Sequence, residues 1–87
     1  MPDLHIERID EAVAVRADFQ GGVVSPVAFR RQAREHRVTR INARWLDRAA
    51  RQPILYFSIT DEHGDVYQLQ LHTADMVWRL DSVALEG

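Results

Sequence analysis

The segment "VYQLQLHT", residues 66–73, alternates strictly between apolar and polar side chains, and it constrains the fold more than any other stretch. Successive side chains of an extended chain point to opposite faces, so this alternation predicts a half-buried β-strand. The apolar face would carry Tyr67, Leu69 and Leu71, and the polar face Gln68, Gln70 and His72. The preceding run "ILYFSIT", residues 54–60, is rich in β-branched and aromatic residues, which also favour a strand.

Five residues, "DEHGD", separate these two runs and include Gly64. A short connection of this kind predicts a β-hairpin, with Gly64 at a positive φ that other residues adopt only at a steric cost. After a turn at 73–75, residues 76–85 place Met76, Trp78 and Leu80 on one face and complete a three-stranded meander. Near the N-terminus, residues 13–19 alternate in the same way and predict a strand that ends at the glycine pair 21–22. Residues 4–9 either extend that strand or form a short separate one.

The middle of the chain, residues 26–51, fits two templates. With a period of two, the inward positions are Thr39, Ile41, Ala43 and Trp45, and the outward positions are Arg40, Asn42 and Arg44. With the helical period of 3.6, the inward stripe is Val38, Ile41, Trp45 and Ala49, and Ser25-Pro26 would begin the helix. The run 38–42 is poor in helix formers, which favours a strand up to Trp45. Residues 46–52 then predict a short helical turn that Pro53 ends.

A pattern of core and turn residues runs through about two-thirds of the chain: Pro26, Phe29, Arg34, Val38, Ile41, Arg44-Trp45, Gly64, Tyr67, Leu69 and Trp78-Arg79-Leu80. This pattern resembles a family of small uncharacterised bacterial domains, a domain of unknown function. The chain departs from it at Arg31, Ala33 and His36, where the family pattern has an aromatic residue, a glycine and a tyrosine. The resemblance implies an all-β fold, and it brings no established activity and no catalytic residues.

We therefore expect residues 1–87 to form a single small domain. Its fold is predicted to be all-β: one antiparallel, strongly bent five- or six-stranded sheet or small barrel, with at most one short helical turn. The alternative is an α+β fold with helix in 26–51. Trp45 and Trp78 are expected to anchor the core, because each removes a large apolar area from water. A chain of this size buries only about 60–65% of its surface, which favours a shallow groove over a deep pocket.

Residues 30–51, hereafter the arginine strip, hold eight of the eleven arginines and a net charge of +6, whereas the rest of the chain carries −8. Guanidinium groups bind phosphate oxygens well, and nucleic-acid binding begins with phosphate neutralisation. The candidate nucleic-acid-binding residues are Arg30, Arg34, Arg37, Arg40 and Arg44, with Gln32 and Asn42 as further donors. Two arguments stand against this hypothesis. The many acids of the chain offer partners for the arginines, and all seven aromatic residues occupy core-like positions, which leaves none for base stacking.

No catalytic residue, metal site or cofactor is predicted. The chain has no cysteine, and His5, His36, His63 and His72 lack the spacing of a metal site. The turn around His63 is too short for a calcium loop and is expected to be a solvated hairpin tip. None of Ser25, Ser58 and Ser82 stands in a nucleophile-elbow context, so we expect the chain not to be an enzyme.

The termini and the hydropathy pattern bear on location. The first ten residues carry acids where a signal peptide needs basic residues, and no apolar run approaches the roughly 20 residues that span a bilayer. We therefore expect a cytoplasmic protein that does not enter a membrane.

Two hypotheses of function follow. The first is a non-enzymatic accessory domain that binds a protein partner or itself through a sheet edge or a sheet face. The second is a nucleic-acid-binding accessory protein, related to DNA repair or replication, that uses the arginine strip.

Overall fold

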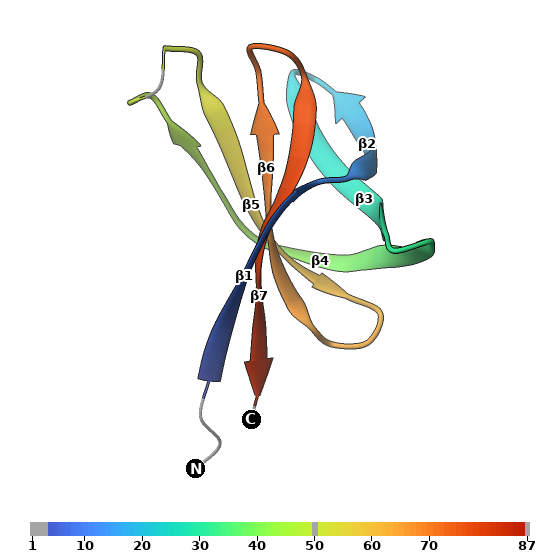
Figure 1. The fold of residues 1–87 in the computed structure, drawn as a ribbon. Coiled ribbons are helices and arrows are strands. Elements are labelled where there is room, and N and C mark those ends of the chain that lie inside the picture. The colour runs from blue at the N-terminus through green and yellow to red at the C-terminus, as the bar shows by residue number, and fades with distance from the viewer. Residues whose placement is uncertain (1–3, 50, 87) are drawn as a thin grey trace.

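A computed structural model of the chain describes residues 4–49 and 51–86 (Figure 1). These residues form seven strands: β1 Leu4–Ala12, β2 Ala14–Gln20, β3 Val23–Arg31, β4 Arg34–Asp47, β5 Ile54–Asp61, β6 Val66–His72 and β7 Val77–Glu86. All neighbours are antiparallel, in the order β1-β7-β6-β5-β4-β3-β2. The predicted all-β antiparallel sheet is therefore confirmed, and no helix long and apolar enough to cross a membrane occurs in the described ranges.

The predicted helical turn in 46–52 and the alternative fold with helix in 26–51 are both wrong. The strand β4 continues through Asp47, and the described residues between it and β5 form bends rather than a helical turn. The carboxylate Oδ1 of Asp47 accepts a hydrogen bond from the backbone N–H of Ala49, 2.8 Å away, which ends the strand. Backbone pairing with β5 thus outweighs the local helix preference of this segment.

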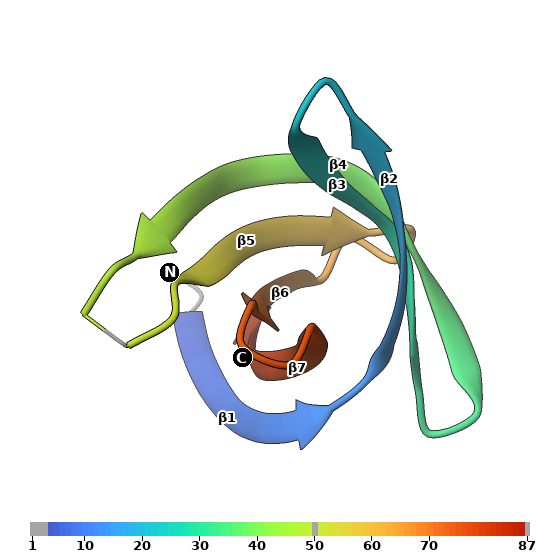
Figure 2. The same ribbon diagram turned by 90° about the horizontal axis from the view of Figure 1, so that it is seen from above.

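The sheet has seven strands rather than five or six because residues 4–20 form two strands with different partners. β1 pairs with β7, whereas β2 pairs with β3 at the opposite edge. Between them, the N–H of Val13 donates to the carbonyl of Trp78 at 3.1 Å, and the chain then passes from its pairing with β7 to its pairing with β3. Figure 2 shows the resulting curl of the sheet, with β6 and β7 inside the arc of β4 and β5. The predicted small barrel is not formed, since the two edge strands β1 and β2 do not pair.

The C-terminal hairpin is as predicted. Gly64 lies in the turn between β5 and β6 with φ of 83°. Tyr67, Leu69 and Leu71 are buried on the inner face, where the core forms. The whole buried core cluster is Phe29, Phe57, Ile59, Tyr67, Leu69, Leu71, Leu80 and Val83.

Two predictions for the tryptophans and their neighbours need correction. Trp78 packs against the core next to Phe57, as expected, with ring centroids 5.6 Å apart. Met76 does not share its face, because it lies in the turn before β7 with φ of 58° and its side chain is 58% exposed. Trp45 is not a core residue either: it is 43% exposed and stacks on Tyr56.

The position of Trp45 results from two irregularities in β4. The register with β5 shifts between Val38 and Arg40 and again between Ile41 and Ala43, each shift inserting one extra residue. A β-bulge of this kind changes which side chains face the core. Val38 and Ile41 pack against the core. Contrary to the alternating pattern, Thr39, Ala43 and Trp45 are exposed, and Arg44 takes an inward position opposite Phe57.

Candidate functional site

The most open part of the sheet lies between β3 and β4. These strands pair over only four residues each, from Ala28↔Arg37 to Arg31↔Arg34, next to the turn that joins them. Beyond this short ladder, β3 stays with β2 and β4 stays with β5, so the two strands diverge. Within the described residues, no strand pairs with the facing edges of β3 from 23 to 27 and of β4 from 38 to 47.

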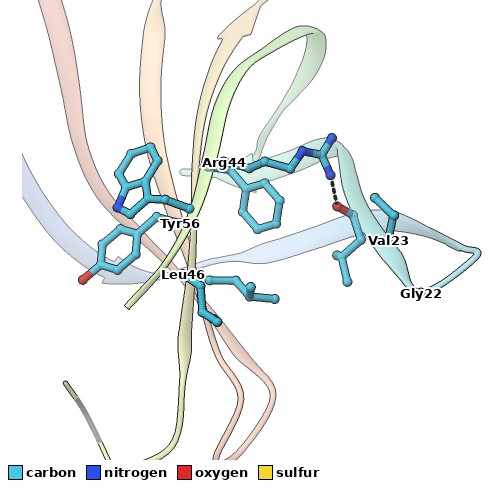
Figure 3. A pocket seen from close by; sticks show the side chains of 9 residues that line it. Gly22, Val23, Arg44, Leu46 and Tyr56 are labelled. Atoms are coloured by element: carbon cyan, nitrogen blue, oxygen red, sulfur yellow. Dashed lines mark hydrogen bonds between the residues drawn. The ribbon is translucent and has the colours of Figure 1, made fainter. Parts of the chain in front are cut away.

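A cavity of about 300 Å³ lies where these strands diverge (Figure 3), and we call it the β3–β4 groove. Val23 and Val24 contribute from β3, Arg44 and Leu46 from β4, and the strand β5 supplies further apolar side chains. The complete lining is Gly22, Val23, Val24, Arg44, Trp45, Leu46, Leu55, Tyr56 and Phe57. Val23, Trp45 and Leu46 are among the most exposed large apolar side chains of the described chain, at 50%, 43% and 39%. The groove is therefore apolar, accessible and bordered by unpaired strand edges.

Arg44 is the one charged residue in this lining. Its Nη1 donates a hydrogen bond to the carbonyl of Val24 at 2.9 Å, and its guanidinium lies 5.8 Å from the centre of the Phe57 ring. A whole arginine side chain thus spans the distance between β4 and β3, which in a paired sheet would be a single spacing of about 4.8 Å. Figure 3 shows this side chain reaching across the groove.

The five predicted nucleic-acid-binding arginines do not share one face. Phe29 and His36 point inward and stack on each other, so the alternating residues Arg30 and Arg37 point outward. Arg40 also points outward, because it pairs with Thr60 on the outer side of β5. Arg34 and Arg44 lie on the inner side instead, at opposite ends of β4. Of the two amides expected beside the arginines, Gln32 lies in the β3–β4 turn and Asn42 donates to the hydroxyl of Thr60.

Carboxylates are distributed unevenly among the arginines. The three arginines outside the arginine strip each have one: Arg8 with Asp81 at 3.6 Å, Arg16 with Glu35 at 3.4 Å, and Arg79 with Asp10 at 3.0 Å. Inside the strip, Arg31 binds Glu11 at 2.7 Å. In the part of the chain that the structure describes, no carboxylate lies within 4.0 Å of the other seven strip guanidiniums, those of Arg30, Arg34, Arg37, Arg40, Arg44, Arg48 and Arg51.

A second cluster, which the sequence did not indicate, surrounds the tip of the β5–β6 hairpin. The Nδ1 atom of His36 lies 3.1 Å from Oδ2 of the buried Asp61. The other oxygen, Oδ1, accepts hydrogen bonds from the backbone N–H groups of His63 and Asp65 at 3.0 and 2.9 Å. Glu62 accepts the backbone N–H of Arg37. The side chains of His36, Asp61 and Glu62 offer three ligand atoms within 4.8 Å of one another, but each carboxylate is already held by hydrogen bonds that fix the hairpin.

Next to this cluster is a polar cavity of about 380 Å³, lined by Arg31, Gln32, Arg34, His36, His63, Asp65 and Tyr67. Burial raises the pKa of the Tyr67 phenol above its ordinary value, and the charges of Asp61 and Asp65 raise it further. The phenol therefore stays protonated at neutral pH. The charged side chains of this lining are those of Arg31, Arg34 and Asp65, and Arg31 is already paired with Glu11, so the lining carries no large excess of either charge.

Comparison of the chain with models of protein families, with curated proteins and with solved structures found no match. The resemblance to the family of small bacterial domains thus stays a prediction. The observed geometry is what supports a proposal of function.

Proposed function

We propose that the chain is a non-enzymatic, cytoplasmic interaction domain that binds an extended segment of a partner protein in the β3–β4 groove. The observation that carries the proposal is the divergence of β3 and β4, which leaves two strand edges unpaired on either side of an apolar cavity. An unpaired edge presents backbone N–H and C=O groups to another chain, and an added strand satisfies them. The strands β5, β6 and β7 offer no such template, because each of them pairs with a neighbouring strand on both sides.

The chemistry of the groove specifies the partner. An added strand would point alternate side chains toward Leu55 and Phe57, so every second residue of the bound segment should be apolar. Arg44 has no carboxylate partner among the described residues and sits over the Phe57 ring. It would bind an aspartate or glutamate of the segment in place of the Val24 carbonyl, because a charge-assisted hydrogen bond is the stronger of the two.

The test is to select linear peptides from a displayed random library on the immobilised protein. The selected peptides are then synthesised, and their affinity is measured by calorimetry. We expect a shared pattern of alternating apolar residues with one acidic residue. Amide NMR shifts on binding should concentrate in 23–27 and 38–46. Leu46→Arg places a bulky charge at the groove, and we expect it to weaken binding by more than about tenfold.

The matched control is Ile6→Arg, the same kind of change at an apolar residue that is 64% exposed on β1. Binding should survive it. The proposal would be contradicted if no peptide were selected, or if the selected peptides bound Leu46→Arg with the same affinity as the unaltered protein. Light scattering adds a separate outcome: a dimer that Leu46→Arg converts to a monomer would mean that a second copy of the chain fills the groove, and the assignment to a foreign segment would be wrong.

A further inference from the structure

The outer face of β3, β4 and β5, the face that turns away from the core, carries three exposed arginines on adjacent strands. Arg30 lies on β3, and Arg37 and Arg40 lie on β4. Their neighbours on this face do not neutralise them. The carboxylate of Glu35 binds Arg16, and that of Glu62 accepts a backbone N–H.

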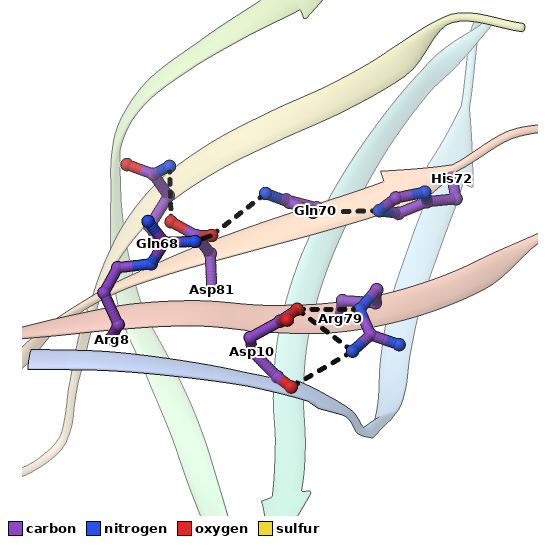
Figure 4. Close-up of polar contacts among 7 residues, drawn as sticks. All are labelled: Arg8, Asp10, Gln68, Gln70, His72, Arg79 and Asp81. Atoms are coloured by element: carbon purple, nitrogen blue, oxygen red, sulfur yellow. Dashed lines mark hydrogen bonds and ion pairs between the residues drawn. The ribbon is translucent and has the colours of Figure 1, made fainter. Parts of the chain in front are cut away.

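The rest of the sheet shows how the acids of this protein are used. Figure 4 shows Arg8 and Arg79 held by Asp81 and Asp10, and Asp81 also accepts hydrogen bonds from Gln68 and Gln70. The acids thus pair with the arginines of β1, β2 and β7. The arginines on the outer face of β3 and β4 have no carboxylate partner among the described residues. Ordinary charge pairing therefore does not account for the outward guanidiniums.

An aromatic platform lies on the same face. Trp45 and Tyr56 are cross-strand partners on β4 and β5, with ring centroids 5.3 Å apart and planes 7° apart. Because Arg40 and Ala43 precede Trp45 on this side of β4, the stack continues the line of arginines rather than lying apart from it. Because of the bulge, the partners of Arg40 and Trp45 on β5, Thr60 and Tyr56, are four residues apart, a distance of about 13 Å along the strand. The 43% exposure of Trp45 leaves its ring open to an incoming base.

We propose that this outer face binds single-stranded nucleic acid, with Arg30, Arg37 and Arg40 on the phosphates and Trp45 stacked on a base. Guanidiniums without carboxylate partners bind the phosphates. The exposed indole stacks on a base with little dependence on sequence, and it can do so in a single strand because the bases there are not paired. The site shares Trp45 and Tyr56 with the border of the groove, whereas its arginines lie on the outer face and the groove residues Arg44 and Leu46 point to the inner side of β4.

The test is fluorescence anisotropy with labelled oligo(dT) and oligo(U) of about 20 nucleotides, longer than one small domain covers. Titrations begin at about 10 mM salt, where the Debye length is about 30 Å, and continue to higher salt. We expect the triple variant Arg30→Gln, Arg37→Gln, Arg40→Gln to bind at least about tenfold more weakly and to lower the salt slope by about 2, since each lost contact to a single strand removes about 0.7. Trp45→Ala should weaken binding by about fivefold or more, and Trp45→Phe by less, because phenylalanine still stacks.

The matched control is Arg8→Gln, Arg16→Gln, Arg79→Gln, which removes the same charge from arginines that carboxylates already hold. It should bind almost as the unaltered protein does. If the two triple variants lost the same amount of binding affinity, net charge alone would explain the effect, and the proposal would be overturned. An absence of binding at low salt would also overturn it. Tighter binding to a duplex of the same length, with no effect of Trp45→Ala, would overturn it too. Leu46→Arg should weaken peptide binding and leave oligonucleotide binding intact. This variant therefore distinguishes a failure of the nucleic-acid proposal from a failure of the groove proposal.

Discussion

The imidazole Nδ1 of His36 lies 3.1 Å from the carboxylate of Asp61, although 25 residues separate the two in sequence. The contact joins β4 to the end of β5 beneath the hairpin tip. Asp61 is 1% exposed, and its second oxygen accepts two backbone hydrogen bonds of the turn. His36 in turn stacks on Phe29 with ring centroids 4.7 Å apart, so a polar contact and a core contact fix the same ring.

Loss of the Asp61 carboxylate should therefore destabilise the protein strongly. Asp61→Ala leaves two backbone N–H groups of the turn and the half-buried His36 ring without the carboxylate that they contact, and we expect the free energy of unfolding to fall by about 2–4 kcal/mol. Chemical denaturation measures it. Asp75→Ala is the control, because Asp75 also accepts a backbone N–H in a turn but is exposed, and we expect a loss below about 1 kcal/mol. Equal effects of the two changes would contradict this role of Asp61.

The two-residue turn between β3 and β4 gives a second prediction. Gln32 and Ala33 have φ of 51° and 60°, a conformation that costs an L-residue about 1–2 kcal/mol. Ala33→Gly removes this cost but adds chain entropy to the unfolded state, so we expect a net gain of about 0.5–1 kcal/mol in the free energy of unfolding. The control is Ala14→Gly on β2, where a strand conformation favours alanine and stability should fall. A loss of stability in Ala33→Gly would show that the turn is not under this strain.

The sequence predicted those parts of the fold in which local alternation and spatial pairing agree. Tyr67, Leu69 and Leu71 are buried as expected, and Gly64 has the positive φ that its place in the turn requires. In β4 the alternating pattern predicted the wrong inward residues. Two bulges each insert a residue, so the inward positions 38, 41 and 44 are three residues apart. A helix produces nearly the same spacing, which is why both periods fitted this segment. Glycine within a strand is one sign of a bulge, but the segment 38–43 contains none, so these two bulges had no signal in the sequence.

The candidate site was less accessible to prediction than the fold. The arginine strip was visible as a charge pattern, but which arginines share a face depends on the bulges, and Arg44 ended on the inner side. The contact between His36 and Asp61 and the gap between β3 and β4 arise from pairing between distant segments. The exposure of Trp45 follows from the same shift in register, and it provides a ring for base stacking that the alternating pattern did not predict.

Tyr67 gives a prediction at alkaline pH. Burial and the nearby carboxylates raise the pKa of its phenol, so the folded chain holds this proton more tightly than the unfolded chain does. Its contribution to stability is complete below the unfolded pKa of about 10 and is lost as the pH rises through that value toward the folded pKa. Urea denaturation at pH values from about 8 to 11 should show a steeper decline for the unaltered protein than for Tyr67→Phe, which has no proton to lose. Identical declines would contradict the assignment.

The ion pair of Arg31 with Glu11 gives a prediction for both the stability of the protein and its binding of oligonucleotides. The Nε of Arg31 lies 2.7 Å from the Glu11 carboxylate, with side-chain exposures of 26% and 43%, so water screens the pair in part. A double-mutant cycle with Arg31→Gln and Glu11→Gln should give a coupling energy below about 1 kcal/mol that decreases with added salt. Because its charge is already compensated, Arg31→Gln should lower oligonucleotide binding less than Arg37→Gln does, although both changes remove one charge. A larger loss from Arg31→Gln would mean that the inner end of the strip, and not its outer face, contacts the phosphates.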